Sequence, residues 1–265
     1  MSTSRVGPAV RSCGPRLSIV IPAFNERARL PRTLADTLRW CDAQAPDAEV
    51  IVVDDGSTDG TRMVVGIFEA QDRRVRCLPC LHKGKGAAVR AGMLQARGHA
   101  ALFMDADGAT PLTEIPKLLR LIEGGSDIAI GSRVLPAAGA RNVDRSLHRR
   151  VMAGCFSGMV SLLAVRGFSD TQCGFKMFRR EAIESIFTLQ HLDGFAFDVE
   201  ILFIARRLRL HIDEVPIDWT TQPGSKMNLV TDSLRMLWDL AFLRWSHRHD
   251  VPRVVLARAG AGSNA

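Results

Sequence analysis

Apolar residues in the first half of the chain form short runs that alternate with amphipathic segments. The runs predict strands at Leu17–Ile21, Val50–Val53, Val75–Cys80, Ala101–Met104 and Asp127–Ile130, and the segments between them predict helices that begin near Ala28, Gly60, Gly84 and Pro111. Strands that alternate with crossover helices are typical of a mostly parallel sheet. We therefore expect an α/β fold in which the ends of several strands border one ligand crevice.

The pattern changes after Arg133. A basic loop from Arg141 to Arg150 leads into residues 151–165, which carry no charge. This segment is too short to span a bilayer, so it is either a buried helix or an interfacial one. The remaining elements are predicted as strands Gly174–Phe178 and His211–Ile217, helices Ala182–Phe187 and Ala196–Leu208, and a last amphipathic helix from Leu229 to Trp245. That last helix either packs on the domain or faces a membrane.

The two ends of the chain lack this pattern. Residues 1–16 and 248–265 are expected to be flexible tails, which leaves residues 17–247 as one domain. The first tail is basic but has no apolar core, so it does not resemble a secretory signal. The chain also has no run of about 18 apolar residues, the length that a spanning helix needs.

Composition narrows the class of protein only a little. The 265 residues are 46% hydrophobic and 24% charged, as in ordinary globular domains. The net charge of +7 suits a phosphorylated substrate, an anionic lipid surface or nucleic acid, and charge alone does not choose among them. Cys77 and Cys80 form a C-x-x-C without a second pair at metal-site spacing. We interpret them as buried thiols of a reducing compartment, and we expect the protein to be cytoplasmic.

The sequence MDADGAT places two acids directly after a predicted buried strand. Asp105 and Asp107 are two residues apart, so in an extended segment both carboxylates point to the same side. Mg²⁺ or Mn²⁺ prefers carboxylate oxygens and completes its shell with substrate phosphates. The alternative is a helix N-cap, because Thr110 and Pro111 also begin a helix.

Two further segments end at the same expected crevice. In IVVDDGSTDGT, Asp54 or Asp55 is placed to accept hydrogen bonds from a base or a ribose, whereas the residues after them suit an ordinary turn. In IPAFNE, Pro22 ends a strand and Glu26 opens a helix at the border of the crevice. HKGKGAA resembles a phosphate cradle but lacks the spacing of a P-loop, so hydrolysis of ATP by that motif is not expected.

Taken in order, IPAFNE, VVDDGSTDGT, KGKGAA, DADGAT and GSR resemble the family 2 inverting glycosyltransferases, which have the GT-A fold. The later segments DTQCGFKMFRREA, FAFDVEIL, EVPIDW and GSK resemble the polyprenyl-phosphate sugar transferases within that family. Among these, DADGAT with DTQCGFK is most similar to the dolichyl-phosphate β-glucosyltransferases, and the dolichyl-phosphate mannose synthases are more distant. The resemblance covers Leu17 to Trp245, with residues 17–133 as the donor-binding half and 134–247 as the half that faces the acceptor and the membrane.

The resemblance implies a nucleotide-sugar donor, a divalent metal (Mg²⁺ or Mn²⁺), a polyprenyl or dolichyl phosphate acceptor and the inner face of a membrane, and it implies no nucleic acid. The implied nucleotide-sugar contacts are Pro22, Phe24, Glu26, Val53, Asp55, Asp105, Ala106 and Lys226. Asp105 and Asp107 would hold the metal. Arg133 would meet the acceptor phosphate or the diphosphate. Ala109 stands where mannose synthases often have Gln or Ser, which favours UDP-glucose over GDP-mannose and leaves the metal fewer protein ligands.

The implied chemistry is one in-line displacement with inversion at the anomeric carbon. A phosphate monoester is already ionised near pH 7 and needs no general base, whereas a hydroxyl acceptor would need one. Asp198 and Glu200 are candidates for that base, and the alternative for them is structural pairing with Lys176, Arg179 or Arg180. A glycosyltransferase with a water-soluble hydroxyl acceptor and a nucleotide-sugar binding protein without catalysis remain open.

Overall fold

A seven-stranded sheet organises the chain in the computed structural model, which describes residues 14–135, 167–220, 238–239, 243 and 245–248. The strands are β1 (Leu17–Ala23), β2 (Glu49–Asp55), β3 (Val75–Cys80), β4 (Ala100–Met104), β5 (Ile128–Ser132), β6 (Phe175–Arg179) and β7 (Ile212–Pro216). The described helices are α1 (Leu30–Gln44), α2 (Thr61–Gln71), α3 (Lys85–Gln95), the 3-10 turn η1 (Leu112–Glu114), α4 (Ile115–Glu123), α6 (Arg180–Phe187) and α7 (Phe197–Arg207). The predicted α/β fold is confirmed, and the element boundaries differ from the predictions by a few residues.

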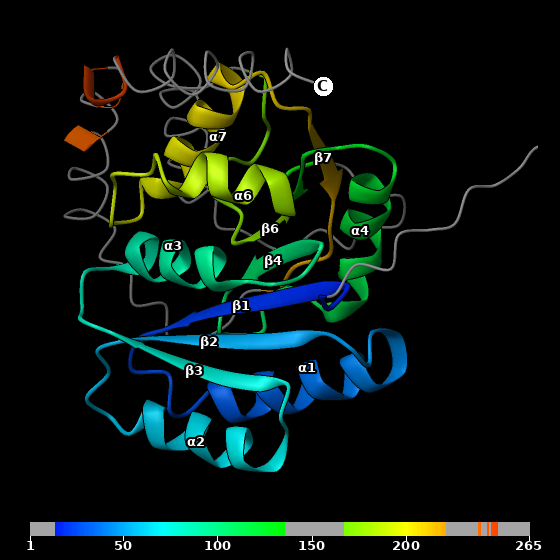
Figure 1. Cartoon of the computed structure of the whole chain (residues 1–265), viewed down its shortest axis with the longest axis vertical. Coiled ribbons are helices and arrows are strands. Elements are labelled where there is room, and N and C mark those ends of the chain that lie inside the picture. The colour runs from blue at the N-terminus through cyan, green and yellow to red at the C-terminus, as the bar shows by residue number, and fades with distance from the viewer. Residues whose placement is uncertain (1–13, 136–166, 221–237, 240–242, 244, 249–265) are drawn as a thin grey trace, which may run out of the picture.

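The strand order is β3-β2-β1-β4-β6-β5-β7 (Figure 1). Every pairing is parallel except those of β6, which runs antiparallel between β4 and β5. The chain leaves β1 toward β2 on one side and later returns to pair β4 with β1 on the other. In open α/β sheets such a reversal of strand order leaves a crevice outside the carboxyl ends of the strands.

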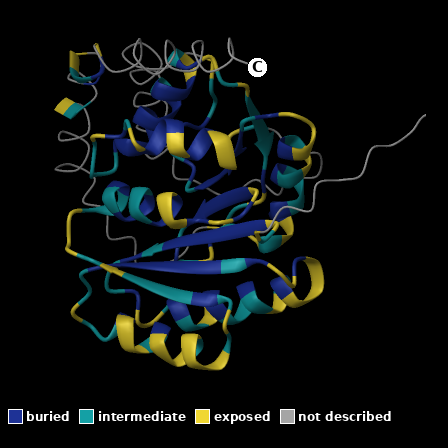
Figure 2. Cartoon of the chain, in the orientation of Figure 1, coloured by how far each residue is buried: buried dark blue, intermediate teal, exposed yellow. Residues whose placement is uncertain are grey.

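Helices cover both faces of the sheet, and two apolar cores result. Along β1, Val20 packs into the core beneath α3, α6 and α7, whereas Ile19 and Ile21 pack into the core against α1, α2 and α4. Figure 2 shows the central strands, β1, β2 and β4 among them, as buried, the edge strands β3 and β7 as mostly intermediate, and the outer surfaces of the helices as exposed. Because strands buried on both faces have apolar residues at successive positions, the runs in the sequence were continuous rather than alternating.

Two predicted segments cannot be compared in full. Residues 151–165 lie outside the described residues, and so does Lys226. Of the predicted last helix, the described positions include Trp238 and Leu243, both helical, and Leu243 is buried in the core beside α7. Among the residues that the structure describes, no helix is both long and apolar enough to cross a membrane.

Candidate functional site

The carboxyl ends of β1, β2 and β4 bring the predicted polar residues to one edge of the sheet. β1 leads to Phe24 and Glu26, β2 ends at Asp55, and β4 is followed by Asp105 and Asp107. A pocket at this edge is lined by Met104, Asp105, Asp107, Ala109, Thr110, Arg133, Cys173, Gly174 and Trp219. The geometry therefore gathers carboxylates and a guanidinium around one space.

Asp107 is held in place by its own turn. Its Oδ1 accepts a hydrogen bond of 3.0 Å from the N–H of Ala109, and Gly108 between them has φ +67°, which favours glycine. No described residue donates a hydrogen bond to Oδ2. The next helical turn, η1, has Pro111 as its N-cap and no side-chain cap. The alternative interpretation of the acids as a helix cap is therefore wrong.

Asp105 faces Lys85, the first residue of α3. Lys85 Nζ lies 2.6 Å from Asp105 Oδ1 and 5.9 Å from the ring centre of Phe197. Burial lowers the pKa of Lys85, but the charges of Asp105 and Asp198 outweigh this effect, so the pKa lies above its usual value. Lys85 is therefore a cation in the cleft, next to the carboxylate that the metal prediction requires.

Gly174 makes room for the Asp105 carboxylate. A Cβ at position 174 would lie 2.7 Å from Asp105 Oδ1 and closer still to Oδ2, nearer than real Cβ contacts come. Gly174 immediately precedes β6, the strand that pairs antiparallel with β4. Its lack of a side chain therefore sets the position of a carboxylate on the neighbouring strand end.

The donor set fits a divalent cation that shares its shell with a diphosphate. Burial, and then the charge of Asp105, raise the pKa of Asp107, so the negative charge of this carboxylate is disfavoured at its position. A bound cation would stabilise that charge. Among the described residues no group of three or more His, Cys, Asp or Glu side chains could hold a metal. Mg²⁺ needs only one or two protein carboxylates when phosphates and water supply the rest.

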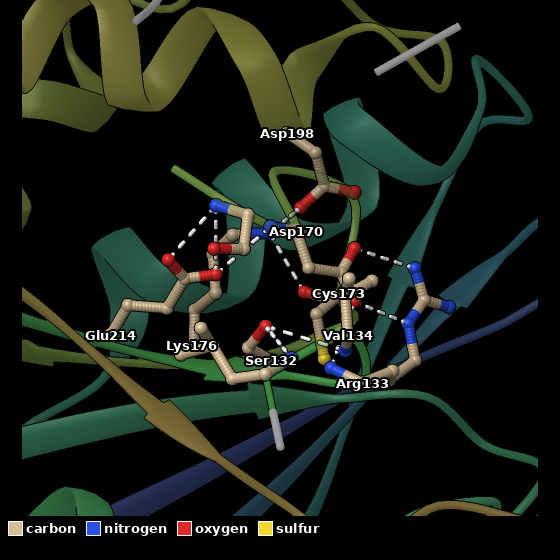
Figure 3. Close-up of polar contacts among 10 residues, drawn as sticks. Ser132, Arg133, Val134, Asp170, Cys173, Lys176, Asp198 and Glu214 are labelled. Carbon is tan, nitrogen blue, oxygen red and sulfur yellow. Dashed lines mark hydrogen bonds and ion pairs between the residues drawn. The ribbon is translucent and has the colours of Figure 1, made fainter. Parts of the chain in front are cut away.

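Arg133, just after β5, is fixed by Asp170 (Figure 3). Its Nε and Nη2 donate to the two oxygens of Asp170 at 2.7 and 2.8 Å, and its backbone N–H donates to Oδ2 at 3.1 Å. Its guanidinium also lies 5.6 Å from the ring centre of Trp219. Burial raises the pKa of Asp170, but the hydrogen bonds and charge of Arg133 outweigh it, so that pKa is lowered. Arg133 is thus an oriented cation in the pocket.

Glu214 on β7 supports this pair from behind. Its carboxylate accepts hydrogen bonds from the backbone N–H groups of Ser169, at 2.9 and 3.1 Å, and of Asp170, at 2.9 Å. Figure 3 shows Glu214, Asp170 and Arg133 as successive members of one polar network. The loop that carries Asp170 is therefore tied to the edge of the sheet.

Asp198 forms a buried ion pair with Lys176. Both side chains are almost inaccessible, at 4% and 0% exposed, and Lys176 Nζ also donates to the carbonyl oxygen of Cys173 at 2.7 Å. Lys176 therefore ties α7 to the segment before β6 that lines the pocket (Figure 3). These contacts match the structural alternative for Asp198, and its role as a base stays a prediction.

Glu200, two residues further along α7 and therefore on a different face of the helix, has a different set of partners. Its oxygens accept from the backbone N–H groups of His191 at 2.9 Å and Leu192 at 2.8 Å, and one of them lies 2.7 Å from His247 Nε2. Glu200 and His247 are both fully buried. Glu200 therefore joins the last described segment to α7, and the pocket lining does not include it.

The loop after β1 is fixed by pairing within it and by a contact with the start of α2. Glu26 accepts two hydrogen bonds from Arg29, at 2.7 and 2.5 Å, and its backbone N–H donates to Thr61 Oγ1 at 2.8 Å. Pro22 is half-buried beside it, whereas Val53 is fully buried in the core beneath α3. The side chain of Val53 is therefore not at the cleft, and a contact between Val53 and the base stays a prediction for its backbone.

Asp55 organises the loop between β3 and α3. Its carboxylate accepts from the backbone N–H groups of Lys83 and Gly84, each at 3.0 Å, and lies 2.8 Å from His82 Nδ1. The His82 ring stacks on Phe24 with centroids 4.0 Å apart. The predicted likeness of HKGKGAA to a phosphate cradle is wrong for these two N–H groups, because the Asp55 carboxylate already takes them.

Ala106 and Ala109 complete the turn after β4. The carbonyl oxygen of Ala106 accepts a hydrogen bond of 2.8 Å from Thr33 Oγ1, and that of Ala109 accepts one of 2.9 Å from the N–H of Thr220. Both alanines are buried, so this turn is held from both sides. The sequence did not identify Lys85, Gly174, Asp170 or His82 as site residues. The motifs KGKG and DTQCGFK contain all of them except His82, which directly precedes KGKG.

A crevice with paired carboxylates at the strand reversal of a mostly parallel sheet defines an α/β domain of the GT-A, nucleotide-sugar-binding type. The family model described as glycosyl transferase family 2 matches residues 18–187. The chain belongs to glycosyl transferase family 2 and is a hexosyltransferase.

Curated relatives indicate which group within the family the chain resembles. The chain is 37% identical over 249 residues to a dolichyl-phosphate β-glucosyltransferase of Saccharomyces cerevisiae, which covers 87% of this chain and 75% of the relative. It is 40% identical over 243 residues to that of Drosophila melanogaster, covering 86% and 74%, and 37% identical over 243 residues to that of Homo sapiens, covering 86% and 75%. The predicted resemblance to this group is confirmed.

Solved structures agree on the fold. Glucosyl-3-phosphoglycerate synthase from Mycobacterium tuberculosis in complex with phosphoglyceric acid matches with a TM-score of 0.66 at 19% identity, over 87% of this chain and 80% of that one. The same enzyme in complex with Mg²⁺ and uridine diphosphate matches with a TM-score of 0.66 at 18% identity, over 87% and 79%. At this identity the likeness shows the fold alone.

Proposed function

We propose that this hexosyltransferase moves glucose from UDP-glucose to a polyprenyl or dolichyl phosphate with inversion at the anomeric carbon. The observation that carries the proposal is the pocket that holds Asp105 and Asp107 together with the oriented guanidinium of Arg133. Identity of 35–40% to dolichyl-phosphate β-glucosyltransferases over most of the chain supports the choice of sugar and acceptor. Ala109 in place of Gln or Ser supports glucose over mannose in the same way.

On the donor side, Phe24 and Asp55 would meet the base and ribose, with Pro22, Glu26 and Ala106 beside them. Lys226, in the segment outside the described residues, would cover the diphosphate. Asp105 and Asp107 would hold Mg²⁺ or Mn²⁺. When bound, the metal neutralises charge that develops on the leaving diphosphate.

On the acceptor side, Arg133 would bind the phosphate of the lipid. The planar guanidinium is held by Asp170, which leaves Nη1 without an acceptor among the described residues and directs a fixed cation toward the pocket. A phosphate monoester with a second pKa of about 6 is ionised at neutral pH and can attack without a general base. The proposed reaction therefore assigns no proton transfer to Asp198 or Glu200.

Peripheral association with the cytoplasmic face of a membrane is part of the proposal. Trp238 is 73% exposed and Trp245 is 55% exposed, and exposed tryptophans suit a membrane–water interface. The four arginines at 141, 145, 149 and 150 lie outside the described residues; each basic side chain near an anionic leaflet contributes about 1 kcal/mol, which salt screens. We expect binding to anionic vesicles to fall with salt without vanishing, and to fall further when the four are changed to Gln.

The deciding experiment uses the purified full chain, Mn²⁺, dolichyl phosphate in detergent, and either UDP-glucose or GDP-mannose with a radiolabelled sugar. We expect label from UDP-glucose in the lipid extract, with the β configuration at the anomeric carbon by NMR. Label from GDP-mannose alone would reverse the assignment of the sugar. Transfer to a water-soluble hydroxyl acceptor, with no lipid product, would replace the acceptor. Nucleotide binding without release of nucleoside diphosphate would show a binding protein.

A further inference from the structure

The side chain of His82 already contacts Phe24 and Asp55, the two residues that the proposed function assigns to the base of the donor. Its ring stacks on Phe24 with an interplanar angle of 16° and a centroid separation of 4.0 Å. Its Nδ1 lies 2.8 Å from Asp55 Oδ2 and 3.1 Å from the carbonyl oxygen of Asp55. One aromatic face and one buried carboxylate thus hold a planar nitrogen heterocycle that belongs to the protein itself.

The chemistry of these partners specifies what the position accepts. An ionised carboxylate and a carbonyl oxygen only accept hydrogen bonds, so His82 Nδ1 carries the hydrogen. The position therefore takes a flat heteroaromatic ring with an N–H at its edge. The imide N–H of uracil and the N1–H of guanine both meet that description. The adenine of a nucleotide has no ring N–H and can donate only through its exocyclic amino group, so it fits less well.

The Asp55 carboxylate has little capacity left. It is 4% exposed and already accepts from the backbone N–H groups of Lys83 and Gly84. Those two bonds fix the loop, whereas the contact with His82 comes from a side chain that is 55% exposed. A base that stacked on Phe24 and donated to Asp55 would therefore have to take the place of the imidazole.

We propose that His82 is an intramolecular competitor of the nucleotide base, which mimics the base at Phe24 and Asp55 and must rotate away before the donor binds. The proposal rests on the proposed function, because it uses the same location for the base. It makes His82 a residue that sets donor affinity, and it names the ligand class as a nucleotide whose base presents a ring N–H.

The backbone around His82 lets the ring leave without rearranging the loop. Gly56, with φ +72°, lets the turn after β2 approach the His82 backbone so closely that a Cβ there would lie 2.9 Å from the His82 nitrogen. The backbone is thus confined by Gly56 and Asp55, whereas the ring has solvent on its exposed side. The movement that the proposal requires is a rotation about the Cα–Cβ bond of His82, which would uncover Phe24 and Asp55.

A side chain that competes with the nucleotide lowers its apparent affinity, because only the fraction of molecules in which the side chain has moved aside can bind. The stacking free energy of one pair of aromatic rings changes the ratio of the stacked and displaced positions of the His82 ring by about two- to tenfold. We therefore expect His82→Ala to bind UDP about two- to tenfold more tightly than the wild type. His82→Asn retains an N–H for Asp55 but loses most of the stacking, and should fall between the two.

The test is calorimetry of the full-length protein with UDP and with GDP in the presence of Mn²⁺. His211→Ala is the matched control, because His211 is an exposed histidine just before β7, and the substitution should leave both affinities unchanged. Thermal unfolding of each variant checks the fold. A second readout is the ¹H–¹³C signal of the His82 ring, which should lose the ring-current shift from Phe24 when UDP is added.

The outcomes separate the two proposals. Weaker binding of UDP by His82→Ala would mean that the ring packs against the base, and it would overturn the competitor. Equal binding by wild type and His82→Ala would overturn it as well. Failure of every variant to bind either nucleotide would instead overturn the proposed function, and the competitor with it. Tighter binding by His82→Ala, together with the NMR change, supports both.

Discussion

The carboxylate of Asp105 occupies the space that a side chain at position 174 would need. Gly174 precedes β6 and Asp105 follows β4, and the antiparallel pairing of these strands brings the two residues together. A Cβ on Gly174 would lie 2.7 Å from Asp105 Oδ1. The position of one metal-ligand candidate therefore depends on the absence of a side chain on the neighbouring segment.

We expect Gly174→Ala to lower metal-dependent transfer about ten- to a hundredfold, because the new methyl group pushes the Asp105 carboxylate out of place by about 1 Å. The fold should persist, since a side chain rather than backbone gives way. Turnover with UDP-glucose and thermal unfolding measure the two effects. Gly66→Ala is the control, because nothing lies within 4 Å of a Cβ at that position in α2. A similar loss of activity in both variants would contradict this account.

Asp107→Asn should abolish metal-dependent transfer and yet stabilise the fold at neutral pH. The pKa of Asp107 is raised in the folded protein, first by burial. The folded state therefore binds more protons than the unfolded state, and the stability from this group falls as pH rises from about 3.9 through the folded pKa. The amide removes that penalty.

Denaturant titrations at pH 4 and pH 7 with and without Mn²⁺ test this expectation. The gain in stability should be larger at pH 7, and Mn²⁺ should stabilise the wild type only. Full activity of Asp107→Asn, or of the wild type in chelator, would remove the metal assignment.

Arg133→Lys should impair use of the lipid phosphate more than binding of the donor. Lysine keeps the charge but cannot form the bidentate hydrogen bonds with Asp170, so the cation loses its fixed orientation. We expect KM for dolichyl phosphate to rise about tenfold or more, with the Kd for UDP changed less than about twofold. Arg62→Lys on the exposed face of α2 is the control. A larger change in the Kd for UDP would place Arg133 on the diphosphate instead.

Asp198→Asn should act on stability before it acts on chemistry. It leaves the charge of Lys176 in a fully buried position, and breaking such a pair costs about 3–5 kcal/mol. The double variant Lys176→Met with Asp198→Leu removes both charges and should recover most of the lost stability. Chemical denaturation and kcat at a temperature where both variants are folded separate the roles. Restored stability with kcat still lost would support Asp198 as a base.

Local pattern was enough to predict most elements of the fold. The buried strands appeared as apolar runs, and the acids at their ends placed Asp55, Asp105 and Asp107 at one edge of the sheet. Burial and strand direction are consequences of residues that are neighbours in the chain, so they leave a visible trace in it. The order of the motifs then indicated the family, which the comparisons confirmed.

Side-chain contacts between segments that are distant in the sequence produced no such pattern. The antiparallel insertion of β6 decides that Gly174 meets Asp105, and the packing of α3 and α7 decides that Lys85 points at Asp105 while Asp198 pairs with Lys176. The contact of His82 with Phe24 and Asp55 joins three segments of the chain. The sequence by itself therefore determined which residue types reach the cleft. The tertiary structure decided which of them touch, because side-chain contacts between strands and helices depend on pairing and packing that no single segment encodes.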